Sequence, residues 1–560
     1  MLRSRRRRRS SRWDTWETRA TVLGVARTLT SATRLLDVLP LLRPDDIEIY
    51  LTIDPGSAFD AGLVDYLASL GPTVLPWREA RRRRFDLAVA CTVHRSMWHL
   101  DAPLMVLPHG AGYNRLIAES TGNTVSAVGL SRRELTRFGR VIPRIIGVSH
   151  EEQIGRLARS CPAAVSRALL VGDPCFDRME RSLSLRDEYR RALGVVGGRR
   201  LVVVNSTWSE HSLIGTCEDL PLRLVRALPT DEFAVAVVLH PNVWARHGTA
   251  RVLGRLVSAM DAGLLVIPPE QGWQATLVAA DCVVGDHGST TFYGAALDRA
   301  TAVLGSGEEE LDPASPTAAF VRAAPRLDPD GDLYQQLRQA LDQHVPGSLS
   351  HLTDRTLGAR GEAARILQRE MYRLLPDHVR APEEAPRPEP LPAPEPRRSA
   401  SARRTATFDV EGQVVDGVVE VRRFPVLPGH QGTRGFFAVT TEETNLLWLQ
   451  TAEVSVRATP HTAVPPERWV AEEAARLPGV TVTVAALGHG RHLVRLRDGR
   501  AWEAAAERAW GEAELELDPV VLGCAVNVWL TSGGAAADLG RGLTVRTGAE
   551  ETRVRLRPQP

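Results

Sequence analysis

The feature that most constrains the fold is a repeated alternation of short apolar runs with segments of helical pattern, between residues 20 and 375. The runs of the first series are Ala20–Ala26, Ile47–Ile53, Phe85–Ala90, Leu104–Pro108 and Arg144–Ser149. The runs of the second series are Leu201–Thr207, Phe233–Pro241, Leu264–Pro268, Asp281–Asp286 and Thr301–Gly305. Short apolar runs that alternate with helices predict parallel β-sheets whose two faces are covered by those helices.

Two successive series of this kind predict an α/β fold with two Rossmann-like lobes, residues 19–190 and residues 191–375. The stretch His351–Leu375 predicts a long helix that closes the second lobe. We expect the lobes to face each other across a cleft. Ligands of such sheets bind beyond the carboxyl ends of the strands, so the residues that follow each run are the candidates for a site.

The remainder of the chain differs in texture. Residues 376–406 are rich in proline with alternating charge, which predicts a semi-stiff linker without a core of its own. Residues 407–560 contain short alternating runs, a hairpin signal at Asp498-Gly499 and one helical stretch, Glu467–Leu477. They predict a β-rich α+β accessory domain, which carries no chemical motif and can serve to bind a protein partner.

Composition excludes several kinds of site. The chain has 560 residues, with 69 basic and 67 acidic side chains, and every basic one is arginine. The absence of lysine excludes a phosphate-binding loop with its lysine, a Schiff-base lysine and a pyridoxal-phosphate anchor. The six cysteines are scattered, without the spacing of a zinc site or of a disulfide scaffold. We therefore expect no metal, no cofactor and a reducing, cytoplasmic environment.

Residues 1–18 carry a run of arginines between Arg3 and Arg12. Such runs are usually solvated, and we expect a disordered tail. The alternative is weak binding to an anionic surface, either RNA or the inner face of a membrane. Of these two, peripheral membrane contact is the one we retain, and we expect no specific nucleic-acid partner.

Two histidines stand at the ends of apolar runs. His109 and Gly110 follow Leu104–Pro108, and His240 comes at the end of Phe233–Pro241. A histidine at such an edge is suited to general acid–base catalysis near its ordinary pKa, and a neighbouring glycine lets backbone approach a ligand. His240 can also donate to a diphosphate. The alternative for both is a histidine that merely occupies a turn.

A third candidate group lies at the end of Leu201–Thr207. There Asn205, Ser206 and Thr207 place small polar side chains at the strand end. The hydroxyl of Thr207 can donate to a phosphate, and it can equally cap the next helix. The sequence leaves both roles open.

The most specific pattern is the loop Gly285–Thr291, which leads from an apolar run into a helix. Its candidate ligand-binding residues are Asp286, Ser289 and Thr290. A glycine-containing loop at a helix start presents free N–H groups and the positive end of the helix dipole to an anion. The pattern therefore predicts a diphosphate site, with a plain Ser/Thr N-cap as the alternative.

In order and spacing, these motifs resemble those of the CDP-glycerol glycerophosphotransferase family of wall teichoic acid synthesis. They are more loosely similar to those of other GT-B glycosyltransferases and of sugar-nucleotide epimerases. The residues that carry the resemblance are His109-Gly110, the turn with Gly172, Pro174 and Asp177, the pair Thr207-Trp208, His240-Pro241, and Asp286, Ser289 and Phe292.

The resemblance implies a GT-B-like pair of lobes. It also implies a transferase that moves a sugar or an alditol phosphate from a nucleotide-diphosphate donor to an acceptor of the cell envelope. By this analogy His109 is the base that deprotonates the acceptor hydroxyl, while His240 and the helix start at Ser289 and Thr290 bind the donor diphosphate. The donor is then a substrate, and no cofactor is implied.

Three cations of the family's pattern are absent from this chain. Val238-Leu239 stands where an arginine precedes the His-Pro pair, Ser209 where an arginine follows Thr-Trp, and Cys175 where a basic residue follows the interlobe proline. The competing hypothesis is therefore a catalytically degenerate scaffold that senses a ligand or binds a partner protein.

Overall fold

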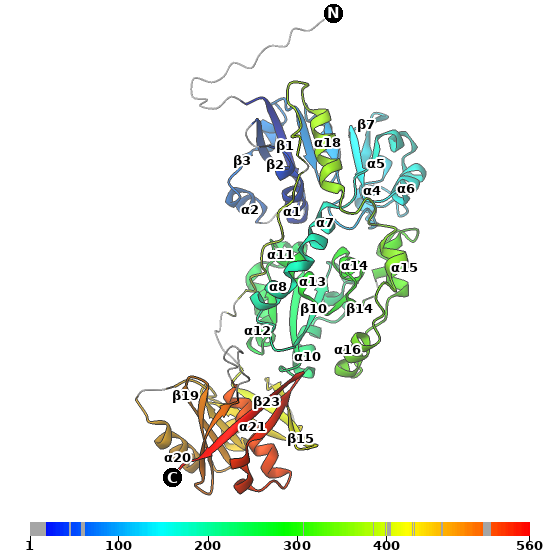
Figure 1. Ribbon diagram of the computed structural model, residues 1–560. Helices are drawn as coiled ribbons and strands as arrows, with labels where there is room; N and C mark the ends of the chain where they lie inside the picture. The colour runs from blue at the N-terminus through cyan, green and yellow to red at the C-terminus, as the bar shows by residue number, and fades with distance from the viewer. Residues whose placement is uncertain are drawn as a thin grey trace, which may run out of the picture.

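The chain forms two parallel-sheet lobes and a C-terminal barrel, which follow one another along the molecule (Figure 1). The computed structural model describes residues 18–43, 46–57, 62–305, 307–384, 386–397, 399, 405–427, 429–430, 432–460, 463–507 and 517–560. The arginine run expected to form a tail lies outside the described residues.

The N-terminal lobe is built on a seven-stranded parallel sheet in the order β3-β2-β1-β4-β5-β8-β9. Its strands are β1 (Ala20–Ala26), β2 (Ile47–Ile53), β3 (Thr73–Leu75), β4 (Leu87–Ala90), β5 (Leu104–Val106), β8 (Ile145–Val148) and β9 (Ala168–Leu170). Its helices are α1 (Leu29–Val38), α2 (Leu63–Ser69), α3 (Trp77–Ala80), α4 (Ala118–Thr121), α5 (Arg132–Leu135) and α6 (Glu152–Ser160). Alternate residues of β1 enter two cores, with Val22 on one face of the sheet and Leu23 on the other, so the sheet is buried on both sides.

The C-terminal lobe repeats this plan with a five-stranded parallel sheet in the order β12-β11-β10-β13-β14. Its strands are β10 (Arg200–Ser206), β11 (Phe233–Leu239), β12 (Leu265–Ile267), β13 (Cys282–Gly285) and β14 (Ala300–Val303). Its helices are α8 (Arg186–Ala192), α9 (Leu213–Thr216), α10 (Leu220–Ala227), α11 (Pro241–His247), α12 (Thr249–Asp261), α13 (Trp273–Ala279), α14 (Ser289–Ala296), α15 (Pro316–Ala323) and α16 (Leu333–Asp342). The strand order reverses between β10 and β13, so the loops that leave these two strands diverge and open a crevice.

The chain passes between the lobes twice, at α7 (Pro174–Arg181) and before α18 (Ala363–Leu374). The long helix predicted for residues 351–375 is wrong, because α17 (Ser350–Thr353) and α18 are separated by a break in which Ala359 (φ 49°) and Gly361 (φ 75°) are left-handed. Asp177 holds this break, accepting hydrogen bonds from the amides of Gly361 (2.8 Å) and Ala363 (3.0 Å). Helix α18 then packs on the N-terminal lobe, beside β1 and β2 (Figure 1).

Where the structure describes it, the proline-rich segment lies against the C-terminal lobe. Leu391 is buried, its carbonyl accepts from the Tyr189 hydroxyl (2.6 Å), and its amide donates to Ser182 Oγ (3.1 Å). The amide of Arg397 donates to the carbonyl of Val266 on β12 (2.8 Å). These contacts replace the water that a free polyproline segment needs, so the segment acts as a strap along the lobe.

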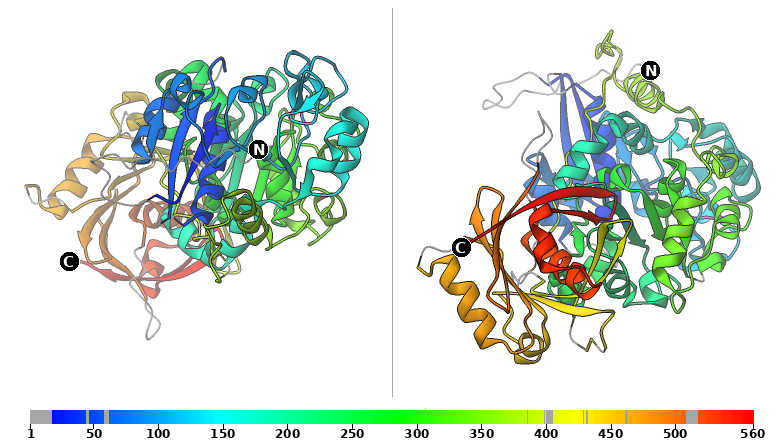
Figure 2. Two further views of the ribbon diagram at one scale, coloured as in Figure 1. Left: turned by 90° about the horizontal axis from the view of Figure 1, so that it is seen from above. Right: turned by 60° about the horizontal axis from the view of Figure 1, so that its bottom comes forward.

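The accessory domain is a closed barrel in the order β15-β16-β22-β23-β21-β20-β19-β18-β17, with β17 returning to β15. Its strands are β15 (Thr407–Val415), β16 (Val418–Pro425), β17 (Phe436–Thr440), β18 (Val454–Arg457), β19 (Val482–Gly488), β20 (Arg491–Leu496), β21 (Ala501–Ala506), β22 (Leu543–Thr547) and β23 (Glu550–Pro558). The expected α+β character is confirmed by helices α19 (Leu446–Thr451), α20 (Pro466–Arg476) and α21 (Pro519–Thr531). Helix α21 is buried within the curved sheet (Figure 2) and supplies much of the barrel core.

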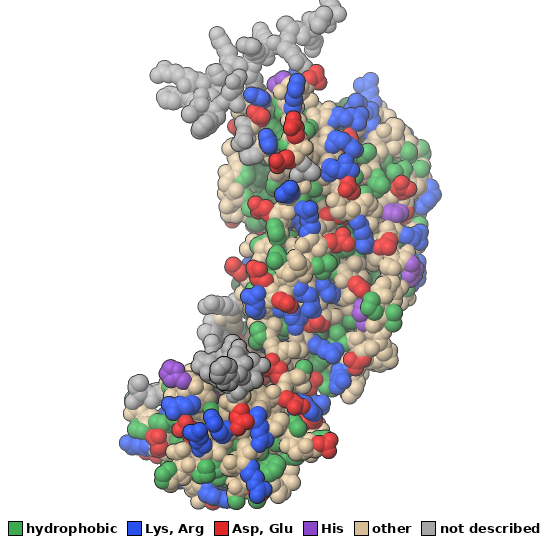
Figure 3. Space-filling view, in the orientation of Figure 1, with side chains coloured by type: hydrophobic (Ala, Val, Ile, Leu, Met, Phe, Trp, Pro, Cys, Tyr) green, Lys and Arg blue, Asp and Glu red, His purple; other side chains and the backbone are tan. Residues whose placement is uncertain are grey.

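Basic and acidic side chains are interspersed over the visible face of both lobes and of the barrel (Figure 3). Within the described residues, no helix combines the length and apolarity needed to cross a bilayer. The same residues contain no group of three or more potential metal ligands. The cysteines are all buried as free thiols.

Candidate active site

A cavity of about 640 Å³ lies between the two lobes, at the carboxyl ends of both sheets. The sequence-predicted residues that line it are His109, Gly110, Thr207, His240, Ser289 and Thr290. They come from the loops after β5, β10, β11 and β13. The fold therefore brings residues more than a hundred positions apart to one place, as the parallel-sheet prediction requires.

His109 has one ring nitrogen fixed by the protein. Its Nδ1 lies 3.2 Å from the carbonyl oxygen of Cys91, which can only accept, so Nδ1 carries the proton and donates. In the neutral ring this leaves a lone pair on Nε2. Removal from bulk water lowers the pKa of His109 from 6.5, and the charges of Arg34 and Arg115 lower it further. The ring is therefore held as a neutral hydrogen-bond acceptor, which is the state that a general base needs.

His240 has the opposite tautomer. Its Nδ1 accepts a hydrogen bond from the amide of Asn242 (3.1 Å) and caps α11, so in the neutral ring the proton is on Nε2. Burial lowers the pKa of His240 from 6.5 to about 3, and nearby Arg115 and His109 contribute to the shift. His240 is thus a neutral donor, the counterpart of His109 in the same cavity.

The first turn of α14 offers free backbone donors. The N-cap is Gly288, which has no side chain to accept from the turn, so Ser289 and Thr290 are helical residues and the plain Ser/Thr N-cap alternative is wrong. The N–H groups of the first turn, with the positive end of the helix dipole, form an anion-binding arrangement. The Ser289 hydroxyl also accepts from the amide of Ala111 (3.2 Å), and it therefore joins the two lobes.

Asp286, which the sequence predicts as a ligand-binding residue, does not line the cavity. Its side chain is fully buried, and its carboxylate accepts from the amides of Thr207 (2.8 Å), Leu213 (2.9 Å) and Gly288 (2.9 Å). A carboxylate with these acceptor sites filled holds the loops after β10 and β13 together. Its negative charge would also repel a diphosphate.

Arg115 also lines the cavity, although the sequence motifs did not predict it. It comes from the N-terminal lobe and reaches the other one, donating to Thr207 Oγ1 (3.0 Å) and to the carbonyl oxygen of Trp208 (2.9 Å). It also pairs with Glu310, whose carboxylate lies 2.8 Å from His287 Nε2. Burial opposes the charge of Glu310, but the hydrogen bond from His287 and the charge of Arg115 hold its pKa below the usual value. The signal available in the sequence was a lone cation shortly after His109.

A second buried group joins the lobes at the wall of the cavity. Arg34 of α1 donates to Asp173 Oδ1 (3.1 Å) and to the Tyr293 hydroxyl (3.0 Å). Burial raises the pKa of Tyr293 well above its usual value, so the phenol keeps its proton and donates to Asp173 Oδ2 (2.6 Å). This network fixes α1, α7 and α14 relative to one another.

The arginines at the cavity come from one of its two walls. Among the described residues that line the cavity, the arginines are Arg27, Arg34, Arg95, Arg115 and Arg133, and all belong to the N-terminal lobe. The C-terminal lobe contributes neutral donors instead, from His240 and from α14. Positive charge and neutral donors thus meet at the cavity from opposite walls.

No protein-family model matches the chain, and no curated protein matches it. Among solved structures, the wall teichoic acid polymerase TagF is similar at 11% identity, covering 64% of this chain and 89% of TagF, with a TM-score of 0.42. The S. aureus MnaA–UDP co-structure is similar at 11% identity, covering 63% and 97%, with a TM-score of 0.37. The UDP-GlcNAc 2-epimerase of Methanocaldococcus jannaschii is similar at 13% identity, covering 63% and 99%, with a TM-score of 0.38. The fold assignment rests on the two sheets of this chain, which form the facing pair of Rossmann-like lobes expected from the sequence.

Proposed function

We propose that this chain is a transferase that moves a sugar or an alditol phosphate from a nucleotide-diphosphate donor to a hydroxyl of an envelope-type acceptor. The observation that carries the proposal is the opposed pair of tautomers in the interlobe cavity. His109 presents a lone pair on Nε2, and His240 presents a proton on Nε2. A displacement reaction needs one of each, because the attacking group loses a proton and the leaving group gains negative charge.

In the proposed reaction the acceptor oxygen bonds to the anomeric carbon or the phosphorus of the donor, and the bond to the leaving nucleotide breaks. The acceptor proton passes to His109 Nε2. The charge that develops on the leaving phosphate is met by His240 Nε2–H, by the first-turn N–H groups of α14 and by Arg115. Thr207 belongs to this side of the cavity, where its hydroxyl holds the guanidinium of Arg115.

The direct test is turnover, measured as nucleotide release from CDP-glycerol, CDP-ribitol, UDP-sugars and GDP-sugars with the intact protein and a hydroxyl acceptor. We expect one donor class to be consumed by the wild type and not by His109→Ala. Turnover that survives in His109→Ala, or the absence of turnover with every donor, would contradict the proposal.

The second candidate function is a non-catalytic scaffold that binds a ligand between the lobes and a partner protein through the barrel. It is favoured by one observation, the engagement of the Ser289 hydroxyl by the amide of Ala111, which closes part of the anion site from the other lobe. Nucleotide binding without any release of product would support this candidate. Demonstrated turnover would dismiss it.

The proposal also places the protein in the cytoplasm, with peripheral contact to the inner face of the membrane through the Arg3–Arg12 run. The clustered charge of that run supports it. Sedimentation with anionic vesicles, compared between the full chain and a chain lacking residues 1–18, tests this part independently. Equal sedimentation of the two would contradict it.

A further inference from the structure

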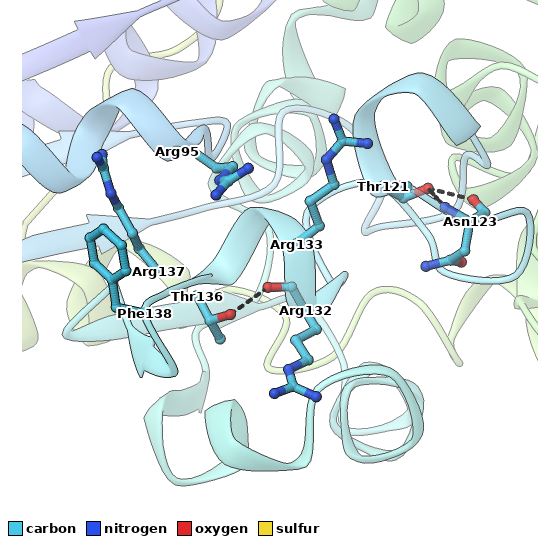
Figure 4. A pocket seen from close by; sticks show the side chains of 9 residues that line it. Arg95, Thr121, Asn123, Arg132, Arg133, Thr136, Arg137 and Phe138 are labelled. Carbon is cyan, nitrogen blue, oxygen red and sulfur yellow. Dashed lines mark hydrogen bonds between the residues drawn. The ribbon is translucent and has the colours of Figure 1, made fainter.

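A basic depression of about 430 Å³ lies on the N-terminal lobe (Figure 4). It is lined by Arg95, Arg132, Arg133 and Arg137, and by the ring of Phe138. Among the described residues that line it, none is acidic. We call this surface the basic depression.

Its charges are not balanced by the protein. Within the described part of the chain, Arg95, Arg132 and Arg133 form no ion pair, whereas Arg34 and Arg156 of the same lobe are paired with carboxylates. Guanidinium groups gathered without counter-charges repel one another and attract anions to the surface between them. Their planar donor geometry suits a carboxylate or a phosphate.

Phe138 lies at the rim of the basic depression, although both the exposure of its ring and its backbone conformation are unfavourable. Its side chain is largely solvent-exposed, at 82%, and its φ of 49° is left-handed. It begins a two-residue turn with Gly139 (φ 74°), between β6 (Thr136–Arg137) and β7 (Arg140–Val141), where asparagine is the usual first residue. A bulky residue is strained in this conformation. An aromatic ring kept exposed under strain is a candidate binding residue.

The ring is also held in place. Trp98 packs edge-on against it, with ring centroids 6.3 Å apart, and the Arg137 guanidinium lies 5.2 Å from its centroid (Figure 4). A flat apolar surface bordered by cations is suited to the apolar face of a sugar ring whose edge carries a negative group.

The basic depression adjoins the interlobe cavity. Arg95 and Arg133 line both. The stem of Arg133 crosses Gly122, where a Cβ would lie 2.8 Å from Arg133 Cδ, so the absence of a side chain there lets the arginine reach between the two spaces. A molecule bound in the depression can therefore extend toward His109.

We propose that the basic depression binds an anionic saccharide, whose carboxylate or phosphate groups contact Arg95 and Arg133 and one of whose rings stacks on Phe138. Resting on the proposed function, this saccharide is the acceptor, and its terminal hydroxyl enters the cavity. The concave shape and the arginines shared with the cavity favour a chain-like molecule over a lipid surface, which needs a convex apolar contact.

The test is to titrate probes into the intact protein in the absence of donor and to measure their binding by calorimetry. The probes are a hexasaccharide of alternating glucuronate and N-acetylglucosamine, neutral maltohexaose, tripolyphosphate, and vesicles containing anionic phospholipid. We expect the acidic hexasaccharide to bind with a salt-dependent affinity and maltohexaose not to bind. Phe138→Asn, which suits the turn and removes the ring, should weaken binding about tenfold. Arg133→Gln should weaken it similarly and reduce the salt dependence.

The matched control is Arg251→Gln, an exposed arginine of α12 in the other lobe, which should leave the affinity unchanged. Failure of the hexasaccharide to bind, binding of tripolyphosphate that Phe138→Asn leaves intact, or binding of vesicles alone would each overturn the inference. Donor binding is titrated separately. If the donor binds and the saccharide does not, this inference alone is contradicted. If the saccharide binds and no donor does, the proposed function alone is contradicted.

Discussion

At the scale of single residues, the proposed reaction depends on two histidines that share a cavity and differ in which ring nitrogen is protonated. The difference has a local origin, since His109 faces a backbone carbonyl and His240 faces a backbone amide. Neither tautomer can be inferred from the sequence, because it depends on the partner that the fold supplies. Each gives a separate prediction.

His109→Gln keeps a group that can donate to the Cys91 carbonyl but has no titrating nitrogen. We expect kcat to fall by about 10²–10⁴, the usual contribution of general-base catalysis, with little change in donor affinity. Because the pKa of His109 is lowered from 6.5, the acid limb of kcat/KM of the wild type should lie below that pH. His94→Gln, which changes another histidine of the same cavity, is the control. A larger loss in the control would move the role of base to His94.

His240 predicts a pH dependence of stability. Its pKa is about 3 in the folded protein and 6.5 as the ordinary value, so between these pH values the unfolded chain binds more protons. The contribution of His240 is complete above pH 6.5 and is lost as the pH falls toward 3. His240→Gln should therefore reduce the fall in unfolding free energy across this window, measured by urea denaturation. Loss of the α11 cap adds only an offset that does not vary with pH. Parallel curves for the two proteins would contradict the prediction.

The candidate site was predictable where function follows from position along the chain, and not where it follows from contacts. His109, His240, Ser289 and Thr290 stand at strand ends, and a parallel sheet gathers strand ends at one edge. Asp286 also stands at a strand end, but its partners are backbone amides of distant loops, which no local pattern reveals. Arg115 was not predicted, because its contacts are with residues of the opposite lobe, which no local pattern reveals.

At the scale of elements, the loop after β5 comes close to the start of α14 across the two lobes. A Cβ on Gly110 would lie 2.5 Å from Ser289 Oγ and 3.3 Å from Ser289 Cβ. We expect Gly110→Ala to separate the lobes at this point and to weaken donor binding in calorimetry. Ser289→Ala removes the nearer atom, so the double variant should lose less affinity than the two single losses together.

Gly254→Ala in α12 is the matched control for this cycle, because no atom lies within 4 Å of the Cβ that it adds. Its donor affinity should equal that of the wild type. Losses for Gly110→Ala and Ser289→Ala that simply add would show that the two positions do not press on one another.

Helices and strands were predictable from the sequence where they have one apolar face or a regular spacing of apolar residues. Most strands of the two lobes follow the predicted apolar runs, and α20 and the turn at Asp498-Gly499 follow their local signals. The edge strands β3 and β9, which have three residues each, were not predicted. Helix α21 was missed because it is apolar on every side and rich in valine, since the barrel surrounds it and removes the polar face that would mark a helix. Gly523 shows how closely it is held, because a Cβ there would lie 2.7 Å from Val454.

At the scale of the whole molecule, the barrel is fixed to the C-terminal lobe, at a surface away from the interlobe cavity (Figure 1). The contact centres on Arg423 of β16, which is largely buried and donates to both carboxylate oxygens of Asp231 (3.0 and 2.6 Å). It also pairs with Asp518 at the start of α21 (2.8 Å). Burial opposes its charge, yet the carboxylates raise the pKa of Arg423 above its ordinary value, so the pair stays charged.

Arg423→Ala leaves Asp231 without its partner in a buried contact, and we expect a loss of about 3–5 kcal/mol in unfolding free energy. The neighbouring Arg422 pairs with Glu232 (2.9 Å) but is 39% exposed, so Arg422→Ala should cost less than about 1 kcal/mol. Chemical denaturation of both variants measures the difference. Equal losses would mean that the barrel is not held by the buried pair.

The two lobes enclose the interlobe cavity, and we propose that a nucleotide diphosphate binds there. The measurement that tests it most directly is calorimetric titration of CDP-glycerol, CDP-ribitol, UDP-sugars and GDP-sugars into the wild type and into the double variant His240→Ala with Ser289→Ala. The account predicts that one donor class binds the wild type and that the double variant loses this binding. Binding that the double variant retains, or no binding by any donor, would contradict it.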